Sequence, residues 1–109
     1  MAQMLVVEDE LVIRAELRRL LARQGHDVAE AGSVREAETE HHLDRFDLVL
    51  ADVRLPGALG TELVGKAPGV PVLLMTSYAT VRSAVDAMKC GAADYIAKPF
   101  DHDELLALI

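Results

Sequence analysis

The apolar run Leu48–Ala51 is the feature that most limits how this chain can fold. It is too short for a helix, it lies between Asp47 and Asp52, and Pro56-Gly57 soon follow it, so it predicts a fully buried strand of a parallel sheet. In open sheets of this kind, ligands bind beyond the carboxyl ends of the strands. Asp52 is therefore expected at the mouth of a site, although a lone Asp in such a position more often only caps the following turn.

Four further segments predict short strands, and helix signals separate them. Apolar residues recur at helical spacing over Ile13–Leu21 and over Val81–Met88, so Met88 is expected in the core. A capping box of Ser33 and Glu36 begins another helix. The strands are expected at Met4–Val7, Asp27–Ala31, Val70–Met75 and Asp94–Ala97, and the helices around Ile13–Leu21, from Ser33 to about Leu43, at Thr61–Ala67, at Val81–Cys90 and from Asp101 onward.

Strands that alternate with helices are joined by right-handed crossovers, which predicts a three-layer, doubly wound (βα)5 sandwich of the α/β class with a parallel five-stranded sheet. A chain of 109 residues has room for one domain, 1–109. The third helix is expected to be short, because Gly60, Gly65 and Pro68 oppose regular helix. The fifth helix is expected to be truncated, because the sequence stops at Ile109 without a capping signal, which suggests a fragment of a longer protein.

The composition excludes several classes of function. A net charge of −7 opposes direct binding to nucleic acid. Cys90 is the only cysteine, which excludes an internal disulfide and favours a cytoplasmic location, and we expect it to be buried in a helix. His41 and His42 are adjacent, so on a helix they diverge and are expected to be solvated rather than metal ligands. No apolar run is long enough for a membrane span, and the N-terminus lacks a signal-peptide pattern.

Polar residues follow four of the expected strands and should meet at one edge of the sheet. They are Glu8 and Asp9 after the first strand, Asp52 after the third, Thr76 after the fourth and Lys98 after the fifth. Three converging carboxylates repel one another unless a hard cation neutralises them, and oxygen ligands of this kind favour Mg²⁺, or else Mn²⁺. Such an ion, a lysine and a hydroxyl around one carboxylate suit the transfer of a phosphoryl group onto Asp52.

The order and spacing of these motifs resemble the receiver domain of a two-component response regulator, over nearly the whole chain. The resemblance implies a flavodoxin-like sheet of order 2-1-3-4-5. The segment from Thr80 to Phe100 looks most like receivers of sigma-54-dependent activators of the nitrogen-regulatory type. The motifs are Val6-Val7-Glu8-Asp9-Glu10, Asp47-Leu48-Val49-Leu50-Ala51-Asp52, Met75-Thr76-Ser77 and Asp94-Tyr95-Ile96-Ala97-Lys98-Pro99-Phe100.

The resemblance also implies a role for each residue at this edge. Asp52 would accept the phosphoryl group, with Asp9 as a direct Mg²⁺ ligand, Glu8 as a ligand through water and Arg54 as a ligand through its backbone carbonyl. Asp52 would also contact the ion.

Three other residues would read out the phosphorylation, again by resemblance. Thr76 would hydrogen-bond a phosphoryl oxygen, Lys98 would pair with the group, and Tyr95 would be the aromatic switch. The Lys98-Pro99 peptide bond is cis in the family, a state common only before proline. Taken one at a time, each residue also suits an ordinary surface or strand position, and only their joint placement favours the site.

The resemblance implies a switch module and not an enzyme, with a sensor histidine kinase as partner. An output domain beyond Ile109 and a homodimer on phosphorylation are expected, and neither a membrane nor direct nucleic-acid contact. An aspartate-based phosphatase is a less favoured alternative, because that class has Asp at the second position after its nucleophile, where this chain has Arg54. A stand-alone receiver that acts through protein contacts is another alternative, and an unphosphorylated scaffold is disfavoured by the complete set of site residues.

Overall fold

The computed structural model describes residues 2–76, 81–98 and 101–109 of the chain. Its main sheet has five parallel strands in the order β2-β1-β3-β6-β7, which is the predicted order 2-1-3-4-5 once the strands of this sheet are counted along the chain. These strands are β1 (Gln3–Val7), β2 (Asp27–Ala31), β3 (Leu48–Asp52), β6 (Val72–Thr76) and β7 (Asp94–Ala97).

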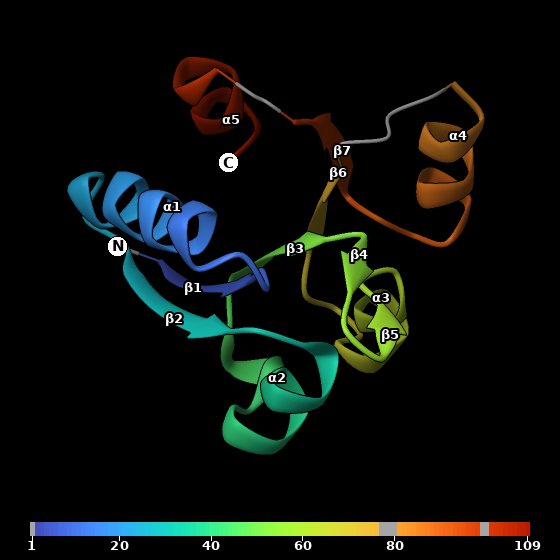
Figure 1. Cartoon of the computed structure of the whole chain (residues 1–109), viewed down its shortest axis with the longest axis horizontal. Helices are drawn as coiled ribbons and strands as arrows, with labels where there is room; N and C mark the ends of the chain where they lie inside the picture. The colour runs from blue at the N-terminus through green and yellow to red at the C-terminus, as the bar shows by residue number, and fades with distance from the viewer. Residues whose placement is uncertain (1, 77–80, 99–100) are drawn as a thin grey trace.

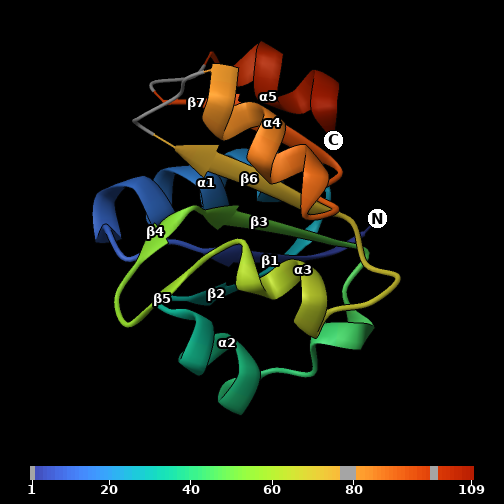
Figure 2. The same ribbon diagram turned by 90° about the vertical axis from the view of Figure 1, so that its right-hand side faces the viewer.

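Helices cover both faces of the sheet, as the prediction of a three-layer sandwich requires (Figures 1 and 2). Successive residues of a strand point to opposite faces, so Val6 and Leu50 pack with Leu17 of α1 and Leu105 of α5, on one side. The opposite core contains residues of α2, α3 and α4. The helices are α1 (Leu11–Arg23), α2 (Val34–Glu40), α3 (Glu62–Lys66), α4 (Val81–Lys89) and α5 (His102–Leu108).

The segment after β3 contains a small hairpin that the sequence did not predict. Strands β4 (Arg54–Leu55) and β5 (Ala58–Leu59) pair antiparallel around the expected Pro-Gly turn, where Gly57 has a φ of 78°. The following helix α3 has only five residues and lies inside the predicted range Thr61–Ala67. The shortened third helix is therefore confirmed.

Helix α2 ends earlier than predicted. It stops at Glu40, and a short 3-10 helix η1 (Leu43–Arg45) follows, whereas the sequence predicted one helix to about Leu43. His41 has an extended backbone, its ring nitrogen Nε2 lies 3.0 Å from the carbonyl oxygen of Glu30, and its ring contacts the edge of Phe46. These contacts leave His41 half-buried, so the prediction that it is solvated is wrong, while His42 is exposed.

The apolar stripe of α4 is also placed differently from the prediction. Val85 is 44% exposed and Met88 is 48% exposed, whereas the smaller Ala87 is buried against the sheet. Cys90 follows the last residue of α4 and is exposed, so its predicted burial is wrong. None of the helices in the described ranges has the length and apolar character that a membrane crossing requires.

Candidate functional site

Asp52 is the last residue of β3 and lies at the carboxyl edge of the sheet. The strand is buried because β1 and β6 pair with its two edges and helices cover both of its faces, and only 9% of Asp52 remains exposed. Its oxygen Oδ1 accepts a hydrogen bond of 3.1 Å from the backbone N–H of Arg54. One carboxylate oxygen of Asp52 therefore does cap the following turn, which leaves the other oxygen for a different partner.

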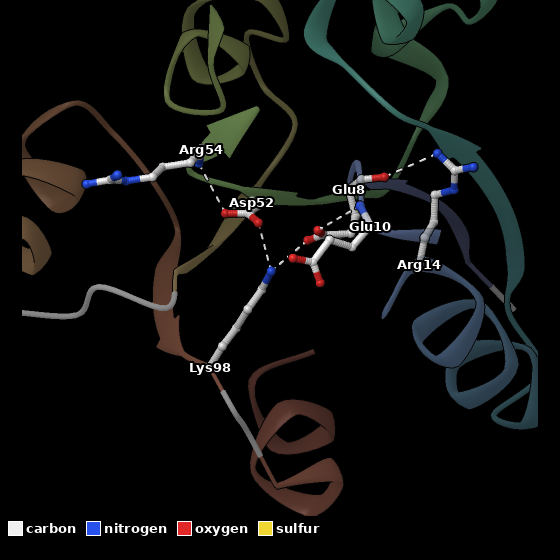
Figure 3. Close-up of polar contacts among 6 residues, drawn as sticks. All are labelled: Glu8, Glu10, Arg14, Asp52, Arg54 and Lys98. Carbon is white, nitrogen blue, oxygen red and sulfur yellow. Dashed lines mark hydrogen bonds and ion pairs between the residues drawn. The ribbon is translucent and has the colours of Figure 1, made fainter. Parts of the chain in front are cut away.

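That other partner is Lys98, which follows β7 (Figure 3). Its Nζ atom lies 2.7 Å from Oδ2 of Asp52 and 2.8 Å from Oε2 of Glu8, so one ammonium bridges two carboxylates. The Lys98 side chain is 8% exposed, and its backbone N–H donates to the carbonyl of Thr76. The parallel register of the sheet is what brings these residues together, because each follows the carboxyl end of its own strand.

Three acids form a compact cluster at this edge. Carboxylate oxygens of Glu8, Asp9 and Asp52 all lie within 4.8 Å of one another. Glu8 is fully buried, whereas Asp9 is exposed. Three carboxylates against the single ammonium of Lys98 leave an excess of negative charge, and their oxygen atoms are the donors that Mg²⁺ and Mn²⁺ prefer. The donor set therefore fits a hard divalent cation.

Burial and pairing change the acidity of two of these groups. Burial raises the pKa of Glu8 from 4.5 to about 7, although the hydrogen bond from Lys98 acts in the opposite direction. Burial alone would lower the pKa of Lys98, but its hydrogen bonds to Asp52 and Glu8 outweigh that effect and raise the pKa above its ordinary value. The lysine is therefore held in its charged form, ready to pair with an anion at Asp52.

Thr76 and Tyr95 lie on the same face of the sheet, next to this cluster. Thr76 ends β6 and is 4% exposed, and Tyr95 of β7 is half-buried. Both line a cavity of about 350 Å³ between the β4–β5 hairpin and α4, whose wall also includes Leu59 and Ala87. The space next to the two predicted switch residues is therefore open.

The comparisons with known proteins agree with this geometry. A family model of the response regulator receiver domain matches residues 4–109. The chain belongs to the response regulator receiver family. The receiver is 41% identical to the response regulator protein FleR of Pseudomonas aeruginosa, over 99% of this chain and 24% of that protein. It is 42% identical to the transcriptional regulatory protein ZraR of Escherichia coli K12, over 96% of this chain and 25% of that protein.

Solved structures of receiver proteins have the same fold. A response regulator from Burkholderia pseudomallei, solved with a phosphorylated aspartic acid, calcium ion and citrate, superposes with a TM-score of 0.87 at 31% identity, over 99% of this chain and 66% of that chain. The receiver spans about a quarter of the length of the two curated relatives. The predicted family and fold are confirmed.

The structure brings together most of the residues that the sequence singled out for the site. Glu8, Asp9, Asp52 and Lys98 converge directly. Arg54 contributes its backbone N–H, while its side chain points away from Asp52 (Figure 3). The role of its carbonyl as a ligand stays a prediction, and the cis bond before Pro99 lies outside the described residues.

Sequence reasoning missed two residues that contact the backbone of the site. Arg14 of α1 donates from Nη1 to the carbonyl oxygen of Glu8 at 3.2 Å. Gly60 packs so closely on Asp52 that an added Cβ atom would overlap the Asp52 carbonyl. Contacts with a backbone carbonyl leave no periodic pattern in a sequence, and the position of Arg14 one turn into a helix that starts at this edge is the only signal that was available.

The raised pKa of Glu8 predicts how the metal-free receiver responds to pH. The folded state binds the Glu8 proton more tightly than the unfolded state does, so the free energy of unfolding should fall as pH rises from about 4.5 to about 7. Urea unfolding over this range should show that Glu8→Gln gains stability relative to the wild type as the pH increases. Glu10→Gln, which changes an exposed neighbour, should leave the pH dependence as it is. A parallel pH dependence for wild type and Glu8→Gln would contradict the prediction.

Proposed function

We propose that this receiver takes a phosphoryl group from a phosphohistidine of a sensor histidine kinase onto Asp52, in the presence of Mg²⁺. The observation that carries the proposal is the arrangement around the Asp52 carboxylate. Oδ1 is held by the N–H of Arg54, and Oδ2 lies 2.7 Å from Nζ of Lys98, with Glu8 and Asp9 adjacent. This is a carboxylate fixed between a cation and a potential metal site.

Asp9 and Asp52 would hold the ion directly, Glu8 through water and Arg54 through its backbone carbonyl. When bound, Mg²⁺ would neutralise the carboxylates and spread the negative charge of the incoming phosphoryl group. Mn²⁺ has the same preference for oxygen ligands and is expected to support the reaction in place of Mg²⁺. Without a cation at this position, the three carboxylates would repel an anionic donor.

The protein groups position the reacting atoms. A carboxylate oxygen of Asp52 forms the bond to phosphorus while the bond between phosphorus and the histidine nitrogen breaks, and the nitrogen keeps the electron pair. Lys98 pairs with the transferred group, because its ammonium is already held next to the acceptor by one short contact to Asp52 and another to Glu8. The exposed residues Leu11 and Val12, which are 69% and 79% exposed beside Asp9, offer an apolar surface for the kinase.

The output is proposed to be a change of surface that controls an attached domain. The resemblance to receivers of sigma-54-dependent activators, together with the similarity to regulators such as ZraR, supports a transcriptional output and a homodimer formed on phosphorylation. A stand-alone receiver is the alternative. The cytoplasmic location expected from the lone cysteine stays a prediction. An aspartate-based phosphatase is less favoured, because Arg54 occupies the position where that class has Asp.

Intact mass spectrometry after incubation with acetyl phosphate tests the proposal. With Mg²⁺ the receiver should gain the mass of one phosphoryl group, and with excess EDTA it should gain none. The phosphoryl group should persist long enough to be observed and should not be turned over in many cycles, as it would be by a phosphatase. Equal yields with Mg²⁺ and with EDTA would refute the role of the metal.

Thr76 and Tyr95 are proposed to form one two-state element. A phosphoryl group on Asp52 gives the Thr76 hydroxyl a strong acceptor, and the cavity beside both residues offers space into which the Tyr95 ring can turn. A charge-assisted hydrogen bond of about 1.5 to 3 kcal/mol shifts such an equilibrium by one to two orders of magnitude.

The coupling is testable through association of the receiver. Beryllium fluoride with Mg²⁺ should increase dimerisation in sedimentation experiments, on a form extended beyond Ile109 by two helical turns. Thr76→Ala should remove most of this increase while leaving Mg²⁺ binding intact. Thr39→Ala, which changes an exposed threonine of α2, is the matched control. Unchanged activator-dependent association of Thr76→Ala would show that the two residues are not coupled in this way.

A further inference from the structure

We propose that Arg14 is a positioning residue for Asp9 and acts through the backbone of Glu8. The inference rests on the proposed function, because Asp9 matters here as a ligand of Mg²⁺. Arg14 itself lies away from the acidic cluster. Its guanidinium contacts the Glu8 carbonyl from the side opposite to the Glu8 carboxylate, which points toward Lys98 (Figure 3).

Two hydrogen bonds fix the peptide units on either side of Asp9. Arg14 Nη1 donates to the carbonyl oxygen of Glu8 at 3.2 Å, which orients the peptide unit that precedes Asp9. The N–H of Glu10 donates to Oε1 of Glu8 at 3.2 Å, which orients the peptide unit that follows Asp9. Because each peptide unit is planar, fixing both leaves little freedom in the two backbone dihedrals of Asp9.

The Asp9 side chain depends on this backbone for its position. Asp9 is exposed, and within the described ranges no hydrogen bond or ion pair of its carboxylate is found. Glu8, in contrast, is held at both ends, since its N–H donates to the carbonyl of Ala31 and its carboxylate accepts from Lys98. The orientation of the Asp9 carboxylate therefore depends on the backbone groups that hold Asp9, in the way that outer-shell partners orient the ligands of other metal sites.

Arg14 is itself held in place between α1 and the end of β2. Its Nε lies 3.6 Å from Oε1 of Glu30, and its side chain is 20% exposed. Gly32 leaves room for the guanidinium, because a Cβ atom at that position would lie 3.0 Å from Nη1. Arg18 approaches the same Glu30 carboxylate at 3.6 Å but makes no contact with Glu8, so it offers a matched control.

Loss of Arg14 should change the Mg²⁺ affinity in opposite directions, depending on whether Arg14 acts through its charge or by orienting Asp9. The positive charge of Arg14 repels Mg²⁺ even from outside the acidic cluster, so the removal of that charge alone should tighten Mg²⁺ binding. The loss of the hydrogen bond to Glu8 should weaken it, because Asp9 is then less well placed. The sign of the change in Mg²⁺ affinity therefore separates a positioning role from a purely electrostatic one.

The test is a titration of the receiver with Mg²⁺, followed by amide NMR, for the wild type, Arg14→Gln, Arg18→Gln and Gly32→Ala. We expect Arg14→Gln to raise the dissociation constant for Mg²⁺ by about tenfold. Arg18→Gln should leave it unchanged or lower it slightly. Gly32→Ala alters no charge, but its added methyl group would crowd the Arg14 guanidinium. It should therefore raise the dissociation constant for Mg²⁺ by a smaller factor. The Glu10 amide should exchange with solvent faster in Arg14→Gln than in the wild type.

The outcomes separate this inference from the proposed function. A wild-type receiver that fails to bind Mg²⁺ would defeat the proposed function itself. A wild type that binds Mg²⁺, together with an Arg14→Gln variant that binds it equally well or more tightly, would overturn the inference alone. An equal loss of affinity in Arg14→Gln and Arg18→Gln would also overturn it. Urea unfolding reports whether Arg14→Gln is folded. If it is not, the Mg²⁺ affinity of Gly32→Ala decides whether Arg14 positions Asp9.

Discussion

Replacing Asp52 by alanine is expected to abolish phosphorylation by acetyl phosphate, so that intact mass shows no gain even at saturating Mg²⁺. Asp52 is the acid that lies within hydrogen-bond distance of both Lys98 and the turn that follows β3. Glu8 is fully buried and shares Lys98, and burial favours its protonated form, so it should not replace Asp52 as the acceptor. The expected loss is complete, since Glu8 is buried and Asp9, among the described residues, lacks the contacts with Lys98 and the Arg54 N–H that fix Asp52.

Asp47→Asn is the matched control for this experiment. Asp47 lies just before β3, at the opposite end of the strand from Asp52, and its carboxylate accepts a hydrogen bond from the N–H of Gln3. The change removes one negative charge next to the far end of β3 while leaving the acidic cluster intact, so the phosphorylated fraction should equal that of the wild type. A phosphoryl group on the Asp52→Ala variant, located by peptide mapping, would show that Asp52 is not the acceptor.

The sequence predicted those parts of the fold that depend on short apolar runs. The five strands of the main sheet follow from runs such as Leu48–Ala51, because such runs can be buried only between two helical layers. The order of the strands was instead implied by the resemblance to receiver domains. Glu8, Asp52 and Lys98 could be placed together because each follows the carboxyl end of a strand. Their distances and the raised pKa of Glu8 required the structure.

Other parts of the fold depend on contacts between elements, which no local sequence pattern indicates. The stripe containing Val85 and Met88 has helical spacing, but spacing alone does not show whether a neighbouring element covers it, and both side chains are exposed. Helix α2 ends early because His41 bonds to Glu30, a residue on another element. The hairpin β4–β5 has strands of two residues, which are too short for any alternation to be visible.

Gly60→Ala is expected to produce the second large effect, a loss of both stability and phosphorylation. Gly60 is buried, its N–H donates to the carbonyl of Val53 at 2.8 Å, and an added Cβ atom would lie 2.9 Å from the carbonyl carbon of Asp52. The opposing atoms are backbone atoms, so a side-chain rotation cannot relieve the overlap. Relief requires the end of β3 to move, at a cost of about 1 to 3 kcal/mol in the free energy of unfolding.

Gly65→Ala is the matched change in the same segment, and it should act in the opposite direction. Gly65 lies within α3, is exposed, and has no atom within 4 Å of an added Cβ, so alanine should stabilise the receiver by about 0.5 to 1 kcal/mol. Urea unfolding measures both free energies, and the rate of phosphorylation at saturating Mg²⁺ shows whether Asp52 has moved. Because the overlap at Gly60 involves the Asp52 carbonyl itself, Gly60→Ala should slow phosphorylation even in protein that is fully folded. A destabilised Gly60→Ala variant that is phosphorylated at the wild-type rate would show that the backbone relieves the overlap at another residue and that Asp52 keeps its position.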